Sequence, residues 1–98
     1  MYELRYKPPA EKYLRKLKEK GLIAVYKETL IKISENPYGA GEAKTGDLAG
    51  IYCCDVYYNK TNYEIAYQIF EVDEQLVVVI LAGTRENFYQ ELKRYMPL

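Results

Sequence analysis

Histidine and tryptophan are absent from this chain of 98 residues, and cysteine occurs only twice. Without histidine the chain lacks the residue that enzymes use most often as a general acid or base. Two cysteines without histidine also fall short of the ligand set of a zinc site. We therefore expect no metal and no cofactor, and any catalysis has to use other side chains.

Long apolar runs are missing as well. The longest apolar block, residues 76–82, has the length of a strand, whereas a membrane-spanning helix needs about 20 apolar residues. The first residues, MYELRYKPPAEKY, do not contain the apolar stretch of a signal peptide. We expect a cytoplasmic protein with no membrane segment.

The two cysteines, Cys53 and Cys54, are neighbours in a segment that we expect to form a strand. Adjacent strand residues point to opposite faces of a sheet, so we expect no disulfide between them. We predict two reduced thiols, one in the core and one outside, as is usual in a reducing compartment.

The formal net charge is zero, but the charges are unevenly distributed. Residues 1–34 carry nine Lys and Arg and four Asp and Glu, a net charge of +5, whereas residues 35–98 carry five and ten, a net charge of −5. Nucleic-acid-binding domains usually have a basic surface, so the charges support an RNA partner only in the N-terminal part. The length and the apolar content of 49% predict one packed domain over residues 1–98.

Apolar periodicity predicts the order β-α-α-β-β-β-α. Short alternating or apolar segments predict four strands, over residues 2–7, 51–58, 63–70 and 76–82. Stripes of helical period predict two helices, from Pro9 to Gly21 and from Leu22 to Asn36, and a final helix after its N-cap Thr84, with Phe88, Leu92 and Tyr95 facing inward. Residues 38–49 read as a loop.

We expect these elements to form an α+β domain with a small four-stranded sheet and helices packed on one of its faces. The segment 76–82 is apolar at every position, so it should be the most buried strand. The other face of the sheet is then open to solvent or to a partner. Its hairpin presents Cys53, Asp55, Tyr57 and Glu64, and no arginine.

The element order, together with the motifs ENPY at the end of the second helix, KTGDLAG in the loop and AGTRENFY near the C-terminus, resembles the RelE/ParE superfamily of toxins from type II toxin–antitoxin systems. The resemblance covers nearly the whole chain. It implies a cytoplasmic toxin that a cognate antitoxin neutralises. RelE-like members cut mRNA in the ribosomal A site without a metal, and ParE-like members poison DNA gyrase.

The resemblance also implies candidate catalytic residues. RNA cleavage without a metal needs a group that accepts the 2′-hydroxyl proton, cations near the phosphoryl group, and an acid for the leaving oxygen. By position in the family motifs, Lys44 and Arg85 are the cations, and Glu42 and Tyr89 are candidates for the proton transfers. Each also has an ordinary interpretation, because loop charges are commonly solvated and a tyrosine beside Phe88 can be packing.

The strand positions depart from the family pattern. Where members often carry arginine, this chain has Cys53, Asp55 and Glu64, and carboxylates beside a phosphate add repulsion. Three hypotheses are therefore open: a ribosome-dependent endoribonuclease (mRNA interferase), a non-catalytic toxin that binds DNA gyrase, and a decayed toxin that retains only antitoxin binding and co-repression. The prevalence of RNA cleavage in the family favours the first.

Overall fold

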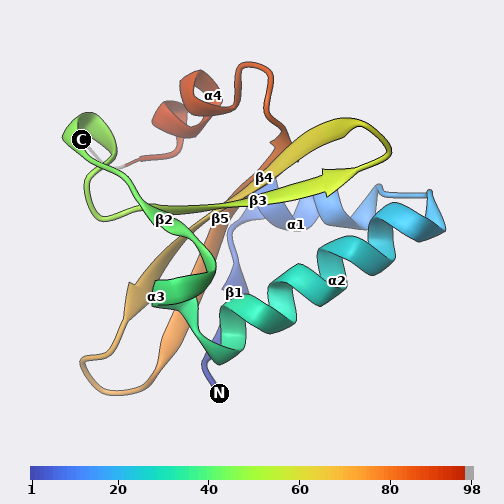
Figure 1. The fold of residues 1–98 in the computed structure, drawn as a ribbon. Coiled ribbons are helices and arrows are strands. Elements are labelled where there is room, and N and C mark those ends of the chain that lie inside the picture. The colour runs from blue at the N-terminus through green and yellow to red at the C-terminus, as the bar shows by residue number, and fades with distance from the viewer. Residues whose placement is uncertain (97–98) are drawn as a thin grey trace.

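The computed structural model describes residues 1–96 and contains a five-stranded sheet with helices on both sides (Figure 1). The elements are β1 (Glu3–Tyr6), α1 (Pro8–Arg15), α2 (Lys20–Glu35), α3 (Pro37–Ala40), β2 (Glu42–Ala43), the 3-10 turn η1 (Gly46–Leu48), β3 (Tyr52–Tyr58), β4 (Thr61–Phe70), β5 (Leu76–Thr84) and α4 (Phe88–Arg94). The strand order is β1-β5-β4-β3-β2, with β1 parallel to β5 and the other neighbours antiparallel. Within residues 1–96, no helix combines the length and the apolar composition that crossing a membrane requires.

The α+β class is confirmed. The sheet has five strands, whereas the sequence predicts four. The additional strand, β2, is only two residues long and pairs with the start of β3. It lies in the segment 38–49, which the sequence predicts to be a loop, together with α3 and η1. Two-residue strands leave no period that a sequence pattern can reveal.

The first face of the sheet packs against α1 and α2. The core there includes Tyr26 and Ile33 from α2, Ala10 from α1, and Ile65 and Val79 from the strands. Pro8 and Pro9 occupy the first turn of α1, where a missing backbone N–H costs nothing. This face matches the predicted helical stripes.

The second face is partly covered by α4, which corrects the expectation of helices on one face only. Phe88 and Leu92 of α4 are buried against Ala66 of β4 and Ile80 of β5. Figure 1 shows α4 on the opposite side of the strands from α1 and α2. The reason is that both faces of the sheet carry apolar residues at this end, and α4 is the element left to cover the second.

Both cysteines are buried, so the expectation of one exposed thiol is wrong. Cys53 is 5% exposed beneath α4, and Cys54 is 8% exposed in the core that α1 and α2 cover. Both are free thiols. Their alternation across the sheet is as predicted, but each face is covered where they lie.

The helix boundaries also differ from the prediction. The first helix ends at Arg15, and Gly21 lies in the first turn of α2 instead of ending α1. A Cβ atom on Gly21 would lie 2.1 Å from the hydroxyl oxygen of Tyr58 on β3. The glycine thus accommodates a tyrosine from a distant strand, and a helix-breaking role does not explain it.

The bounds of the C-terminal strand and helix also differ from the predicted bounds. The predicted most buried strand is confirmed as β5, an interior strand between β1 and β4. It extends through Thr84, so Thr84 is not a helix cap, and the residue before α4 is Asn87 with φ 59°. Tyr95 follows α4 and is 43% exposed, so it does not face inward.

Candidate active site

The loop before β3 places Lys44 against the second face of the sheet. The backbone N–H of Lys44 donates to the carbonyl of Ile51 (2.9 Å), which extends the β2–β3 pairing by one bond. Further along the loop, Asp47 forms an ion pair with Lys93 of α4 (3.6 Å). The loop and α4 are therefore joined across the face that carries the candidate residues.

Three of the four predicted site residues are brought together. The Nζ atom of Lys44 lies 5.2 Å from the centre of the Tyr89 ring, a cation–π distance. It also lies 3.4 Å from Oε1 of Glu42. The side chain of Lys44 is 22% exposed and that of Glu42 is 81% exposed, so the Lys44 side chain is largely sheltered and the carboxylate of Glu42 is in solvent.

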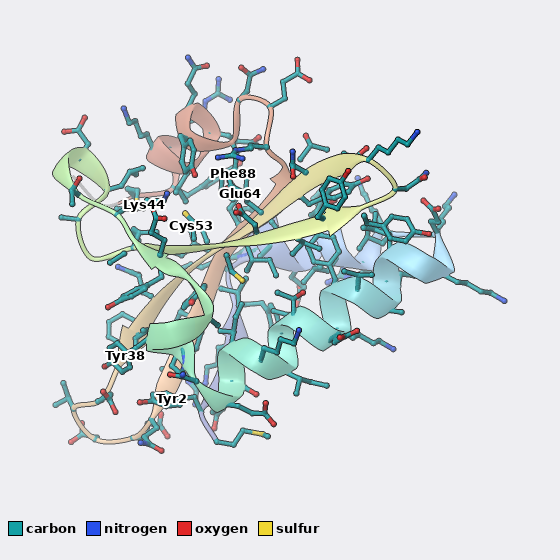
Figure 2. All side chains as sticks on the ribbon, viewed as in Figure 1. Tyr2, Tyr38, Lys44, Cys53, Glu64 and Phe88 are labelled. Carbon is teal, nitrogen blue, oxygen red and sulfur yellow. The ribbon has the colours of Figure 1, made fainter. Side chains whose placement is uncertain are left out.

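A fourth side chain, Glu64, completes this cluster. The hydroxyl of Tyr89 donates to Oε1 of Glu64 (2.8 Å), and Glu64 is 1% exposed. Its second oxygen, Oε2, is buried without a hydrogen-bond partner among the described residues. Figure 2 shows Glu64 with Cys53 and Lys44 on the α4 side of the sheet, near Phe88. A buried carboxylate with one free oxygen is a strained arrangement for a purely structural residue.

The environment shifts the pKa values within the cluster. Burial raises the pKa of Glu64; Tyr89 and Arg85 oppose the rise, and the neighbouring Asp55 adds to it. Burial and the hydrogen bond to Glu64 raise the pKa of Tyr89, although Lys44 acts against them. Burial raises the pKa of Cys53 to about 12, with the charge of Glu64 as the next cause.

Lys44 keeps its positive charge in this setting. Partial burial acts to lower the pKa of Lys44, but its interactions with Tyr89 and Glu42 outweigh burial, and the pKa is raised. At neutral pH Lys44 is therefore an ammonium that can stabilise an anion but cannot accept a proton.

Arg85 lies just after β5, where its backbone N–H donates to the carbonyl of Asn62 (3.0 Å). Its side chain is exposed, and no ion pair within residues 1–96 includes it. Its charge lowers the pKa of Glu64, which indicates that it acts on the cluster from outside. The guanidinium is thus free to meet an anion in solvent.

The cluster therefore combines a sheltered cation, an exposed cation, a phenol and a buried carboxylate. Sequence reasoning treated Glu64 only as a repulsive charge on an open strand. The positions of its two strand partners indicate that Glu64 belongs to the site. It pairs with Asp55 on β3 and with Gly83 on β5, and Gly83 lies two residues before Arg85. The sequence alone does not reveal this pairing, because the pairing depends on the register of the sheet.

Comparison with solved structures shows which known proteins have a similar fold. The chain is similar to the RelBE2 toxin–antitoxin complex of Mycobacterium tuberculosis, with 26% identity, 86% of this chain and 98% of that chain covered, and a TM-score of 0.66. It is also similar to the isolated RelE toxin of E. coli, with 23% identity, 98% and 100% covered, and a TM-score of 0.67. The intact E. coli RelBE complex matches with 24% identity, 86% and 96% covered, and a TM-score of 0.64.

Comparison with sequences identifies the family. No curated protein matches the chain. A family model described as the ParE-like toxin of type II bacterial toxin–antitoxin systems matches residues 4–93, which includes every residue of the cluster. The chain belongs to the ParE-like toxins of type II bacterial toxin–antitoxin systems.

Proposed function

We propose that this protein is a RelE-like toxin that inhibits translation by cleaving mRNA on the ribosome without a metal ion. The observation that carries the proposal is the convergence of Lys44, Tyr89 and Glu64 in one sheltered cluster, with the exposed Arg85 near it. Cleavage next to a 2′-hydroxyl needs cations at the phosphoryl oxygens and a group that takes the proton. This cluster contains both.

The cations are suited to the phosphoryl group. Lys44 stays charged at neutral pH and is held in place by the Tyr89 ring. Arg85 is exposed and has a planar set of donors that matches phosphate oxygens. Two such cations offset the carboxylate of Asp55, which is exposed and can turn toward solvent.

A second candidate function is a non-catalytic toxin that binds a protein such as DNA gyrase. The observation in its favour is the pair of carboxylates, Asp55 and Glu64, which face each other across β3 and β4. A phosphate placed there meets repulsion from these carboxylates, which Lys44 and Arg85 have to offset. A decayed toxin that retains only antitoxin binding and co-repression is compatible with the same pair.

One set of experiments separates these functions. The chain is induced in a heterologous bacterium, and growth, mRNA integrity and plasmid supercoiling are followed together. The purified protein is then added to ribosomes programmed with a defined mRNA, and in parallel to a gyrase supercoiling reaction. Cleavage of ribosome-bound mRNA with normal supercoiling supports our proposal. Loss of supercoiling with intact mRNA, or normal growth, contradicts it.

The proposed partner in the cell is a cognate antitoxin, as in the two RelBE complexes to which the chain is similar. A groove of about 400 Å³ lies between α1 and α4, with Lys12 and Lys16 on one side and Glu86 and Glu91 on the other. We propose that an acidic segment of the antitoxin binds the basic side of this groove by charge complementarity. Co-expression with the product of the neighbouring gene should give a tight complex that Lys12→Glu/Lys16→Glu weakens.

A further inference from the structure

Glu64 is the one member of the cluster for which the family motifs assign no role. Its side chain is fully buried beneath the sheltered face, and one oxygen accepts the Tyr89 hydroxyl at 2.8 Å. The other oxygen has no hydrogen-bond partner among residues 1–96. A carboxylate in this position is poorly solvated and is therefore ready to take a proton.

The direction of the hydrogen bond between Tyr89 and Glu64 determines which of the two can accept a proton from a third group. Tyr89 donates to Glu64, so its hydroxyl oxygen can accept from other groups; Lys44 uses one of the two lone pairs, and the second is available to another donor. The ring is fixed by three contacts: the carboxylate of Glu64, the ammonium of Lys44 and the edge of Phe88, whose ring centre is 5.8 Å away. Tyr89 is only partly buried, whereas the carboxylate that accepts from it is fully buried.

We propose that Tyr89 and Glu64 form a proton relay that serves as the general base of RNA cleavage, with Glu64 as the final acceptor. The inference rests on the proposed RNA-cleaving function. Tyr89 is the residue that touches the substrate, and Glu64 acts through it as a positioning residue that also stores the proton. Neither Lys44, which stays protonated, nor exposed Glu42 is then required as the base.

The 2′-hydroxyl proton passes to the Tyr89 oxygen while the phenolic proton passes to Oε1 of Glu64. The 2′-oxygen forms a bond to phosphorus, and the bond from phosphorus to the 5′-oxygen breaks, which leaves a 2′,3′-cyclic phosphate. The 5′-oxygen takes a proton from water, and the hydroxide so formed is neutralised by the proton that Glu64 returns through Tyr89. Lys44 and Arg85 balance the phosphoryl charge throughout.

Several charged groups act on Glu64 and set the pH range of the relay. Asp55 acts on it from β3, Tyr89 from α4 and Arg85 from the segment before α4; the Cys53 thiol lies close to it on β3, and Lys44 lies against the Tyr89 ring. Burial is the largest influence and raises the pKa of Glu64, which makes it a stronger base than a solvated glutamate. The rate should therefore rise with pH as Glu64 ionises and then level off.

The test uses purified full-length protein and ribosomes programmed with a defined mRNA. Glu64→Gln keeps an oxygen that accepts from Tyr89 but cannot take the proton, so we expect cleavage to fall by about 10²–10⁴-fold, the usual contribution of a general base. The rise of the rate with pH should disappear as well. Tyr89→Phe should give a similar loss, and the double variant should lose no more than either single one, because the two residues act as a unit.

The matched control is Glu35→Gln, the same substitution at an exposed position at the end of α2, which should cleave like the wild type. Circular dichroism and antitoxin binding verify that each variant is folded. If Glu64→Gln cleaves at the wild-type rate with the same pH profile, the relay is wrong and the proposed function stands. If the losses of the two single variants add in the double variant, the relay is also wrong. If the wild type cleaves no mRNA, the proposed function and the relay both fall.

Discussion

Asp55 and Glu64 lie directly opposite each other in the antiparallel ladder between β3 and β4, and only one of them is solvated. Asp55 is exposed, whereas Glu64 is 1% exposed beneath the face that α4 covers. Burial and the adjacent carboxylate of Asp55 together raise the pKa of Glu64. The stability of the fold is therefore linked to the protonation of this one group.

The first prediction concerns pH and stability. Because the pKa of Glu64 is raised in the folded chain, the unfolded chain releases this proton first as the pH rises. The contribution of Glu64 to stability is therefore fully present below its pKa in the unfolded chain, and it is lost as the pH rises through its pKa in the folded chain. Glu64→Gln, which cannot ionise, should have a larger free energy of unfolding than the wild type at pH 7, and this advantage should shrink at pH 4. Urea unfolding of both proteins at pH 4 and pH 7 measures the difference in the free energy of unfolding.

The control for this prediction is Glu86→Gln, a carboxylate that is exposed. Its difference from the wild type should be small and nearly the same at the two pH values. An advantage of Glu64→Gln that is constant from pH 4 to pH 7 would show that the raised pKa of Glu64 has no part in stability.

A second prediction concerns the two cations. Lys44→Ala and Arg85→Ala should each lower mRNA cleavage by about 10²–10³-fold, the usual effect of removing one group that stabilises a developing anion. Growth arrest on induction should be lost in parallel. Antitoxin binding should persist, because neither side chain lines the groove between α1 and α4. Lys27→Ala, an exposed lysine of α2 on the other side of the sheet, is the matched control. Full toxicity of both variants would transfer support to the gyrase-binding hypothesis.

A third prediction concerns Gly41, which lies between α3 and β2. A Cβ atom there would lie 2.4 Å from the Tyr67 hydroxyl oxygen and 3.0 Å from the carbonyl oxygen of Cys53. Tyr67 is fully buried and donates to the carbonyl of Pro37 (2.7 Å), so it has no room to move away. Gly41→Ala should therefore lower the free energy of unfolding by about 1–3 kcal/mol, as overpacking usually does.

Gly83→Ala is the matched comparison, because the nearest atom to a Cβ at Gly83 is 4.0 Å away on Tyr13. Its effect should stay within about 0.5 kcal/mol. Thermal unfolding of both variants provides the measurement. Equal stability of Gly41→Ala and Gly83→Ala would mean that the backbone around Tyr67 yields more readily than the close contacts indicate.

A fourth prediction concerns the thiols. Both cysteines are buried, and burial raises the pKa of Cys53 to about 12, so little thiolate is present at pH 8. A thiol reagent should label neither cysteine in the folded protein and both after unfolding in urea. The single variants Cys53→Ser and Cys54→Ser assign any signal to one position. Rapid labelling of Cys53 in the folded protein would show that α4 leaves the second face of the sheet readily.

The order of the main helices and strands follows from the sequence because it depends on local periodicity. The alternation of residues 63–70 and the helical stripe from Leu22 to Ile33 are visible without any knowledge of distant contacts, and the structure confirms both elements as β4 and α2. The continuous apolar run of residues 76–82 likewise identified β5 as an interior strand. Among the predicted site residues, the loop and C-terminal motifs located Lys44 and Tyr89, which the fold brings together.

Other features depend on contacts between distant segments, which local patterns do not encode. Gly21 reads as the end of a helix until Tyr58 of β3 is seen against it. Glu64 reads as an exposed charge until α4 covers its face of the sheet and Tyr89 donates to it. Periodicity determined which face of the sheet each residue occupies. Only the tertiary structure decided what covers that face, because burial, and with it the pKa of a carboxylate, depends on segments far apart in the chain.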